Sequence, residues 1–315
     1  MKVKDLLSTQ DIRELAQTSD LQGARSVLTD WLIIGAALGF VAWRPGPVTL
    51  IPAMLVIGGR QLGLAILMHE ASHRTLFASR WLNDLVGDWL CAAPIWGDVR
   101  RYREHHLRHH GQTGTEHDPD LGLVTPFPTT KKALARKLLR DLSGLAGMRR
   151  AAALALMDAG LLTYTASVDA RWSRPQERRT LRTRALPSVV RMLAMQAALL
   201  GLFTAGGVPW LILVWWGSWL TTYGLVLRIR SMAEHACTAR SPDPFSNTRT
   251  TDASWLARLL VAPHHVNFHL EHHLLMSVPH WKLPRMHRLL RERGVFTPQN
   301  HAAGYAEVLR QVANA

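Results

Sequence analysis

The sequence is poor in cysteine and in acidic residues. It has 315 residues and only two cysteines, Cys91 and Cys237, which allow at most one disulfide. Neither a CxxC pair nor a clustered-cysteine pattern is present, so an iron–sulfur site held by this chain is excluded. The 23 Asp and Glu residues are outnumbered by 37 Lys and Arg residues, and the formal net charge is +14. No recognised nucleic-acid motif accompanies this charge, so we predict no nucleic-acid partner.

The beginning of the sequence does not have the features of a cleaved signal peptide. The first twenty residues are too acidic, and the first apolar run starts too late, for such a signal. We therefore expect residues 1–26 to form a cytosolic N-terminal segment.

Apolar residues make up 48% of the sequence and are concentrated in four runs. Each run approaches the ~20 residues that a helix needs to cross the hydrocarbon core. The runs form two pairs, each joined by a short turn, and they cover residues 27–43, 48–68, 187–204 and 208–227. One basic residue, Arg44, lies in these turns, and the Arg-rich stretches lie on the other side, which the positive-inside rule places in the cytosol.

This pattern predicts an all-α integral membrane protein with a single domain over residues 1–315. Four transmembrane helices would form two hairpins below a cytosolic helical cap, with both termini in the cytosol. Between the pairs, residues 81–96 suggest an interfacial or re-entrant segment. Residues 131–150 suggest a basic amphipathic helix at the membrane surface, with a solvated loop as the alternative. Whether residues 151–166, which include Asp158, enter the membrane stays open.

Histidines occur in three clusters at the cytosolic ends of the predicted spans. The sequence His69-Glu-Ala-Ser-His73 directly follows the second span, and its two histidines, at i and i+4, share a helical face. Two HxxHH patterns follow, and we expect the three histidines of each to point one way; they are His106, His109 and His110, and His269, His272 and His273. One zinc ion needs only three or four protein ligands, so eight histidines predict two metal ions.

The motifs HEASH, HHLRHH and HLEHH, in this order and with two spans between the second and third, resemble those of the membrane fatty acid desaturase family. This family includes hydroxylases and ketolases, and the resemblance extends over roughly residues 50–290. It implies two iron ions, held almost wholly by histidine, that use O2 to oxidise an unactivated carbon. It also implies a ninth ligand, His235. Some relatives have an asparagine one helical turn earlier, where this sequence has Ser231.

The expected metal ligands are His69, His73, His106, His109, His110, His235, His269, His272 and His273. Nearby side chains can accept a hydrogen bond from the outer nitrogen of a ligand and fix its orientation. The candidates for this role are Glu70, Glu104, Asp118, Asp120, Glu234, Asn267 and Glu271, and each is equally consistent with a surface side chain or a helix cap. Weaker ligand candidates are His105, His264 and His265, and Asp84 and Asp88 either orient histidines or cap a helix.

The resemblance implies an O2-dependent oxidoreductase, and we favour desaturation of a fatty acyl or lipid-like chain over hydroxylation or ketolation. The sequence has no cytochrome b5-type HPGG segment, so a separate electron donor is expected: a ferredoxin, a rubredoxin or a cytochrome b5-type protein. The substrate would be a lipid, or a chain linked to acyl carrier protein or coenzyme A.

Two other classes of protein fit part of the pattern. HEASH also satisfies the zinc protease pattern HExxH, in which Glu70 would be the general base. Such a protease does not need the two HxxHH clusters. A metal transporter would have its ligands within the spans, lining a path; here they follow the spans.

Overall fold

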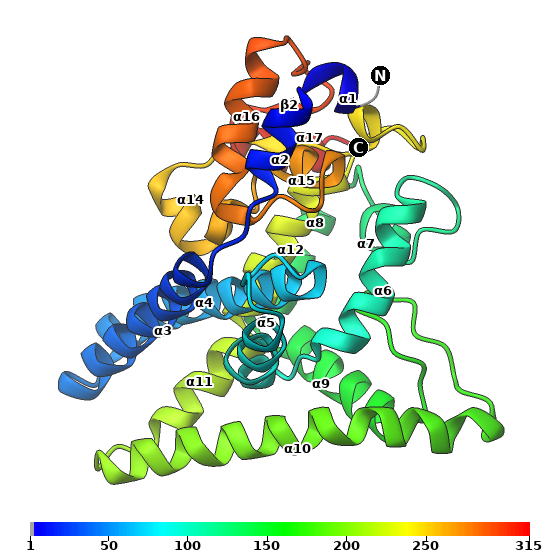
Figure 1. The fold of residues 1–315 in the computed structure, drawn as a ribbon. Helices are drawn as coiled ribbons and strands as arrows, with labels where there is room; N and C mark the ends of the chain where they lie inside the picture. The colour runs from blue at the N-terminus through cyan, green and yellow to red at the C-terminus, as the bar shows by residue number, and fades with distance from the viewer. Residues whose placement is uncertain (1–2) are drawn as a thin grey trace.

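The computed structural model describes residues 3–315 and is mainly helical (Figure 1). The helices are α1 (Val3–Leu6), α2 (Thr9–Leu15), α3 (Asp20–Trp43), α4 (Pro47–His73), α5 (Arg80–Val86), the π-helix η1 (Gly87–Ala92), the 3-10 helix η2 (Ala93–Ile95), α6 (Val99–Gln112), α7 (Leu121–Val124), α8 (Lys131–Leu142), α9 (Leu145–Asp158), α10 (Pro175–Ala205), α11 (Leu211–Leu220), α12 (Thr222–His235), α13 (Pro244–Asn247), α14 (Trp255–Leu260), the 3-10 helices η3 (Pro263–His265) and η4 (His280–Lys282), α15 (His269–Leu274), α16 (Leu283–Glu292) and α17 (Tyr305–Val312). Two short strands, β1 (Thr250–Thr251) and β2 (His301–Ala302), pair in parallel.

Three helices among the described residues are long and apolar enough to cross a membrane: α3, α4 and α10. The predicted spans 27–43 and 48–68 lie within α3 and α4. Span 187–204 is the second half of α10, which begins at Pro175 and continues through Pro187. In the most apolar stretch of α4 61% of the residues are buried, against 28% in α3 and 22% in α10, so α4 is the inner helix of the three.

The predicted fourth span, 208–227, is not one continuous helix and is not among these three candidates. Helix α11 ends at Leu220 and α12 begins at Thr222, because Thr221 has φ −112° and ψ −84°, outside the helical region. The guanidinium of Arg150 donates a hydrogen bond to the carbonyl of Trp219 beside this break. A side-chain donor at an interrupted helix is one of the usual causes of a kink.

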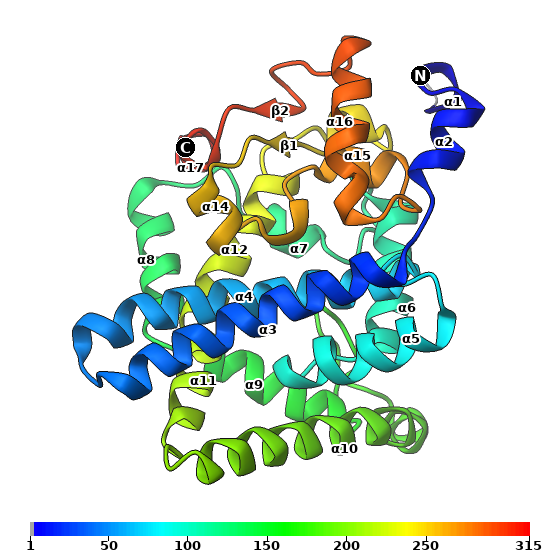
Figure 2. The same cartoon turned by 60° about the vertical axis from the view of Figure 1, so that its left-hand side comes forward.

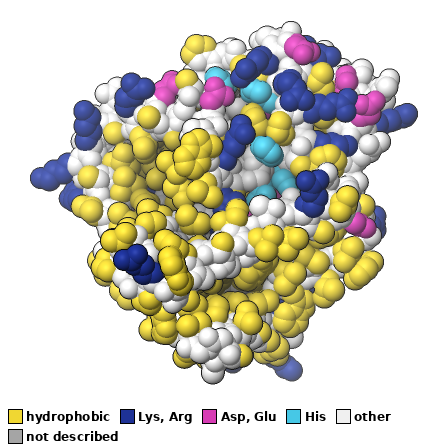
Figure 3. Space-filling view, turned by 90° about the vertical axis from the view of Figure 1, so that its left-hand side faces the viewer, with side chains coloured by type: hydrophobic (Ala, Val, Ile, Leu, Met, Phe, Trp, Pro, Cys, Tyr) yellow, Lys and Arg dark blue, Asp and Glu magenta, His cyan; other side chains and the backbone are white. Residues whose placement is uncertain are grey.

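The turns at the ends of the α3–α4 and α10–α11 hairpins lie on the same side of the molecule, as Figures 1 and 2 both show. Viewed from that side, the surface is mainly apolar, and most charged side chains gather toward the top (Figure 3). Large apolar side chains are exposed along these helices, among them Leu28, Leu32, Phe40, Trp43, Val48, Ile51, Leu186, Val190, Leu193 and Leu200. An apolar surface of this extent is typical of contact with lipid.

The segments between the hairpins differ from their predictions in detail. Residues 131–150 form two helices instead of one, because the chain turns at Gly144, which has φ +81°. Leu134 is buried in the protein, whereas Leu142 and Leu145 are exposed. Helix α9 has 14 residues, too few to cross a membrane, and its last residue, Asp158, lies 2.5 Å from the guanidinium of Arg101.

The C-terminal elements α14 to α17, together with α1 and α2, form a cap above the α3–α4 hairpin (Figure 2). Its core joins the two ends of the chain, because Leu6 and Leu15 pack with Leu270, Met286 and Leu290. Cys91 and Cys237 are both free, the first buried and the second exposed.

Candidate metal centre

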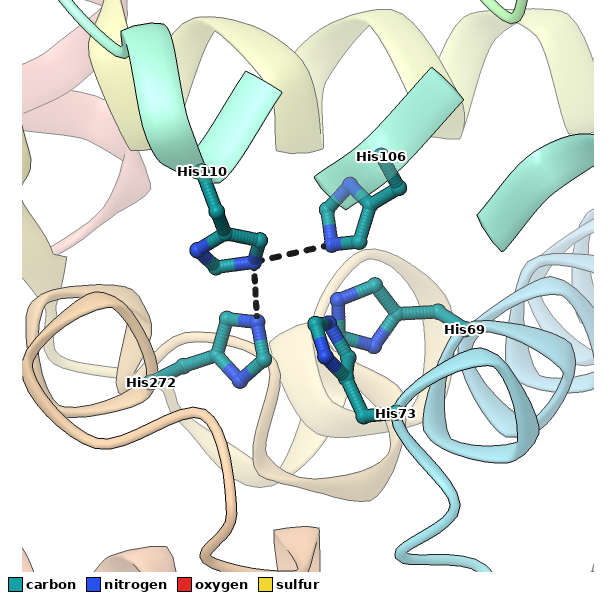
Figure 4. A group of neighbouring side chains, drawn as sticks. All are labelled: His69, His73, His106, His110 and His272. Atoms are coloured by element: carbon teal, nitrogen blue, oxygen red, sulfur yellow. Dashed lines mark hydrogen bonds between the residues drawn. The ribbon is translucent and has the colours of Figure 1, made fainter. Parts of the chain in front are cut away.

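All nine histidines expected as ligands come together in two groups. The five-histidine group is His69, His73, His106, His110 and His272, and the four-histidine group is His109, His235, His269 and His273. Within each group the potential ligand nitrogens all lie within 4.8 Å of one another. Figure 4 shows the five rings facing a common centre. The two groups are adjacent, because the rings of His110 and His273 are 4.3 Å apart.

Helix geometry explains how the HxxHH patterns divide between the groups. In each pattern the histidines at i and i+4 join one group, and the histidine at i+3 joins the other. In α6, His109 turns away from His106 and His110. In α15, His272 turns away from His269 and His273. Adjacent residues of a helix point about 100° apart, so the i+3 and i+4 side chains diverge. The expectation that all three point one way was therefore wrong, and each helix serves both groups.

The inward-facing nitrogens fit metal ions. Nε2 of His110 lies 3.0 Å from Nε2 of both His106 and His272. Two nitrogens bound to one metal at about 2.1 Å and at right angles lie about 3.0 Å apart. Three further histidines have an Nε2 atom that is buried without a hydrogen-bond partner. They are His69 and His73 of the five-histidine group and His273 of the four-histidine group. Buried polar atoms without partners are rare and costly, and a bound metal ion would satisfy them.

Three of the carboxylates predicted to orient the histidines lie beside an outer Nδ1 atom. Asp118 is 2.8 Å from Nδ1 of His109. Glu70 is 3.3 Å from Nδ1 of His69, and Glu234 is 3.3 Å from Nδ1 of His269. Of the three contacts only that of Asp118 is a hydrogen bond; Nδ1 of His69 and Oε1 of Glu234 have no hydrogen-bond partner. An acceptor hydrogen-bonded at Nδ1 keeps the proton there and leaves Nε2 free to bind a metal.

Other predicted side chains have different partners. Asp120 lies 2.8 Å from Nε2 of His105 and reaches Nδ1 of His109 only at 3.7 Å. His264 contacts Asp30, and Asp88 pairs with Arg191.

Three of the predicted orienting side chains are not beside a histidine of either group. Glu104 is exposed and pairs with arginines. Glu271 contacts His287 and Thr250, and Asn267 donates to the carbonyl of Thr251. These three predictions are corrected, because sequence proximity to a histidine does not determine the direction of a side chain.

Glu70 is not placed as a general base. Its Oε2 atom accepts hydrogen bonds from the hydroxyl of Thr75 at 3.0 Å and from the backbone N–H of His280 at 2.9 Å. Its Oε1 atom faces the outer nitrogen of His69, and the side chain is only 3% exposed. A base in an HExxH protease must reach the water on the metal, whereas this carboxylate lies on the opposite side of its imidazole.

Two groups that contact the ligand histidines were not predicted from the sequence. The carbonyl of Asn247 lies 3.0 Å from Nδ1 of His235, and a backbone group leaves no residue-type signal. The ring of Tyr102 stacks on His106, with centroids 5.0 Å apart, and its position one helical turn earlier in α6 was a usable signal.

Burial lowers the pKa values of several histidines in the two groups. It lowers the pKa of His235 to about 3 and lowers the pKa values of His269, His272 and His273 well below the usual range. These imidazoles are neutral near pH 7 and can bind a metal without losing a proton. Burial raises the pKa of Glu234 to about 7.

A model of the fatty acid desaturase family matches residues 45–305. This chain belongs to the fatty acid desaturase family. Such a protein is a membrane oxidoreductase, and the two histidine groups are where it could hold metal ions.

Curated relatives of this fatty acid desaturase family member include both desaturases and a ketolase. It is 26% identical to the dihydrorhizobitoxine desaturase of Bradyrhizobium elkanii, over 86% of this chain and 75% of that protein. It is 22% identical to the sn-1 oleoyl-lipid 12-desaturase of Synechocystis sp., over 93% and 82%. It is 25% identical to the beta-carotene ketolase of Paracoccus sp., over 82% and 88%. The relatives therefore agree on the family and differ in what they act on.

Proposed function

We propose that this protein is an O2-dependent di-iron oxidoreductase that desaturates a fatty acyl or lipid-like chain. The observation that supports this most is the gathering of nine histidines into two adjacent groups, with nitrogens separated as around a metal ion. Imidazole is a ligand that suits iron, and two groups suit two ions. The five-histidine group would hold one iron and the four-histidine group the other.

When bound, the two irons supply the oxidising chemistry, with O2 as oxidant. The chain's own residues prepare the site for them. Buried imidazoles present their Nε2 atoms. Asp118 and the carbonyl of Asn247 accept hydrogen bonds from the outer nitrogens of His109 and His235 and fix these rings, and Glu70 and Glu234 face the outer nitrogens of His69 and His269 at 3.3 Å.

The overall reaction requires an external reductant. Desaturation removes two hydrogen atoms from the substrate while O2 is reduced to two water molecules, which takes two further electrons and two protons. The chain has no haem or iron–sulfur motif, so a ferredoxin, a rubredoxin or a cytochrome b5-type protein would supply the electrons.

The position of the site at the end of an apolar helix supports a lipid-like substrate. Helix α4, an apolar candidate span, ends in His69 and His73, so a hydrocarbon in the bilayer would be near the metal centre. We propose that α11 and the first part of α12 together form a fourth, broken pass, and that the cap and both termini are cytosolic. Ketolation is the second candidate, because the ketolase relative aligns with 82% of this chain.

The metal content of detergent-purified protein tests the proposal. Elemental mass spectrometry should find about two irons per chain in the wild-type protein, as two groups of imidazoles predict. A His272→Ala/His273→Ala variant removes one histidine from each group and should lose most of this iron. One zinc per chain, unaffected by the double substitution, would contradict the proposal and favour the HExxH protease. Incubation with O2, a reductant and lipids, followed by mass spectrometry of the products, separates desaturation from ketolation.

A further inference from the structure

Two ionisable side chains are buried between the apolar helices α3 and α4. Nη1 of Arg60 lies 3.0 Å from Oδ1 of Asp30, and these side chains are 6% and 0% exposed. Gly63 makes room for the carboxylate, because a Cβ atom there would be 2.3 Å from Oδ2 of Asp30. Ionisable groups within membrane helices are costly and usually mark a function. Asp30 and Arg60 are not among the candidate metal ligands, so the metal centre does not by itself account for their burial.

The remaining hydrogen bonds of this ion pair are made to the segment that precedes α15. Nη2 of Arg60 donates to the carbonyls of Arg258 at 2.9 Å and Leu259 at 2.5 Å. Oδ2 of Asp30 lies 2.8 Å from Nε2 of His264. The ion pair therefore attaches residues 258–264 to the membrane hairpin, a few residues before His269.

The backbone at this attachment is strained. His264 and His265 have φ values of 52° and 60°, in the left-handed region that residues other than glycine rarely adopt. Such strain persists only where surrounding contacts determine the conformation, and the bond from His264 to Asp30 is one such contact.

The segment that follows α15 is attached to the same hairpin. The backbone N–H of His280 donates to Glu70 at 2.9 Å, and Nε2 of His280 lies 2.9 Å from the hydroxyl of Ser26. Helix α15 is thus held against α3 and α4 both before and after its histidines. The attachment before it depends on the buried ion pair.

We propose that Asp30 and Arg60 are positioning residues that hold α15 in register with the histidines of α4, α6 and α12. This inference rests on the proposed metal centre. Helix α15 contributes two of the four members of the four-histidine group but only one member of the five-histidine group. Displacement of α15 should therefore empty the four-histidine group first.

The test replaces both charges, as Asp30→Asn/Arg60→Met, because removing one alone would leave a buried unpaired charge. We expect iron per chain to fall by about half relative to the wild type, since one group loses half of its ligands and the other keeps four. The Mössbauer spectrum should then show isolated iron in place of a coupled pair. The control is Glu14→Gln/Arg285→Met, whose ion pair of 2.5 Å joins α2 to α16, two helices that carry none of the nine histidines. Its iron content should stay at the wild-type level.

Hydrogen exchange on the metal-free proteins gives a readout that does not depend on iron. Residues 258–275 should exchange faster in the Asp30/Arg60 variant than in the control. Wild-type iron content in this variant would overturn the inference. If the wild-type protein itself holds no iron, the proposed function fails, and the exchange rates alone decide whether the ion pair positions α15.

A single substitution tests the inference if the double variant does not fold. His264→Ala keeps the ion pair and removes only its bond to η3. We expect the same local increase in exchange with a smaller loss of iron. Normal exchange together with normal iron content in this variant would overturn the inference.

Discussion

The two histidine groups are built from different parts of the chain. The five-histidine group takes two members from α4, two from α6 and one from α15, so most of it is fixed by two long helices. The four-histidine group takes two of its members from α15, which has only six residues, and one each from α6 and α12. The five-histidine group therefore depends mainly on α4 and α6, whereas half of the four-histidine group depends on the position of α15.

Single substitutions that remove one histidine, from either group, should give the largest effects on turnover. We expect His73→Ala and His109→Ala both to lower turnover by at least about 100-fold, since a lost ligand costs more than a lost outer partner, which is worth 10–100-fold. Iron content should separate the two variants. His109→Ala leaves three histidines in its group, whereas His73→Ala leaves four and should retain more metal.

Full turnover in either variant would remove that histidine from the site. Equal iron loss in both would contradict the asymmetry between the groups. Elemental analysis and product assays on the same preparations check both points.

Removing a carboxylate that faces the outer nitrogen of a ligand histidine should have a smaller effect. This effect should differ between Asp118 and Glu70. Asp118→Asn should weaken metal binding by about 10–100-fold, because the bond to His109 is short. Glu70→Gln should do less, since its distance to His69 is 3.3 Å. Competition with a chelator measures both. Loss of all activity in Glu70→Gln with full iron would indicate a direct catalytic role for Glu70.

Acidification should destabilise the metal-free protein. Burial lowers the pKa values of His269, His272 and His273 in the folded state, whereas in the unfolded chain they are near 6.5. As pH falls below about 6.5, only the unfolded state gains these protons, so stability is lost. His109 opposes this. Burial lowers its pKa, but the bond to Asp118 and the nearby charges of Asp118, Asp120 and Glu234 together outweigh burial, so its pKa is raised.

We expect the thermal midpoint of the metal-free protein to be lower at pH 5.5 than at pH 7.5. A midpoint independent of pH would contradict the assignment of these histidines as buried and neutral.

Glu104→Gln should have the smallest effect. Its carboxylate is exposed and pairs with Arg100 and Arg184. Surface substitutions of this kind change stability by about 0.5 kcal/mol or less. Activity and iron content should match the wild type, and a clear loss of either would show that the surface near α6 takes part in the reaction.

Local rules predicted much of the fold. Apolar runs of membrane length identified α3, α4 and the apolar half of α10, because burying backbone polar groups in lipid requires a helix. The break at Thr221 was not predictable in this way, since the side chain that hydrogen-bonds beside it, Arg150, is distant in sequence. The ion pair of Asp30 and Arg60 did leave a signal, as two charged residues within predicted spans, and sequence reasoning missed it.

The sequence by itself indicated the nine histidines of the two groups, eight of them from their spacing at i, i+3 and i+4 and His235 from the family resemblance. Only the tertiary structure decided which histidines share a group and which carboxylates serve them. Asp118 and Glu271 look equivalent beside their motifs, yet one contacts His109 and the other contacts His287. The direction of a side chain depends on the packing of distant segments, which spacing along one helix does not contain.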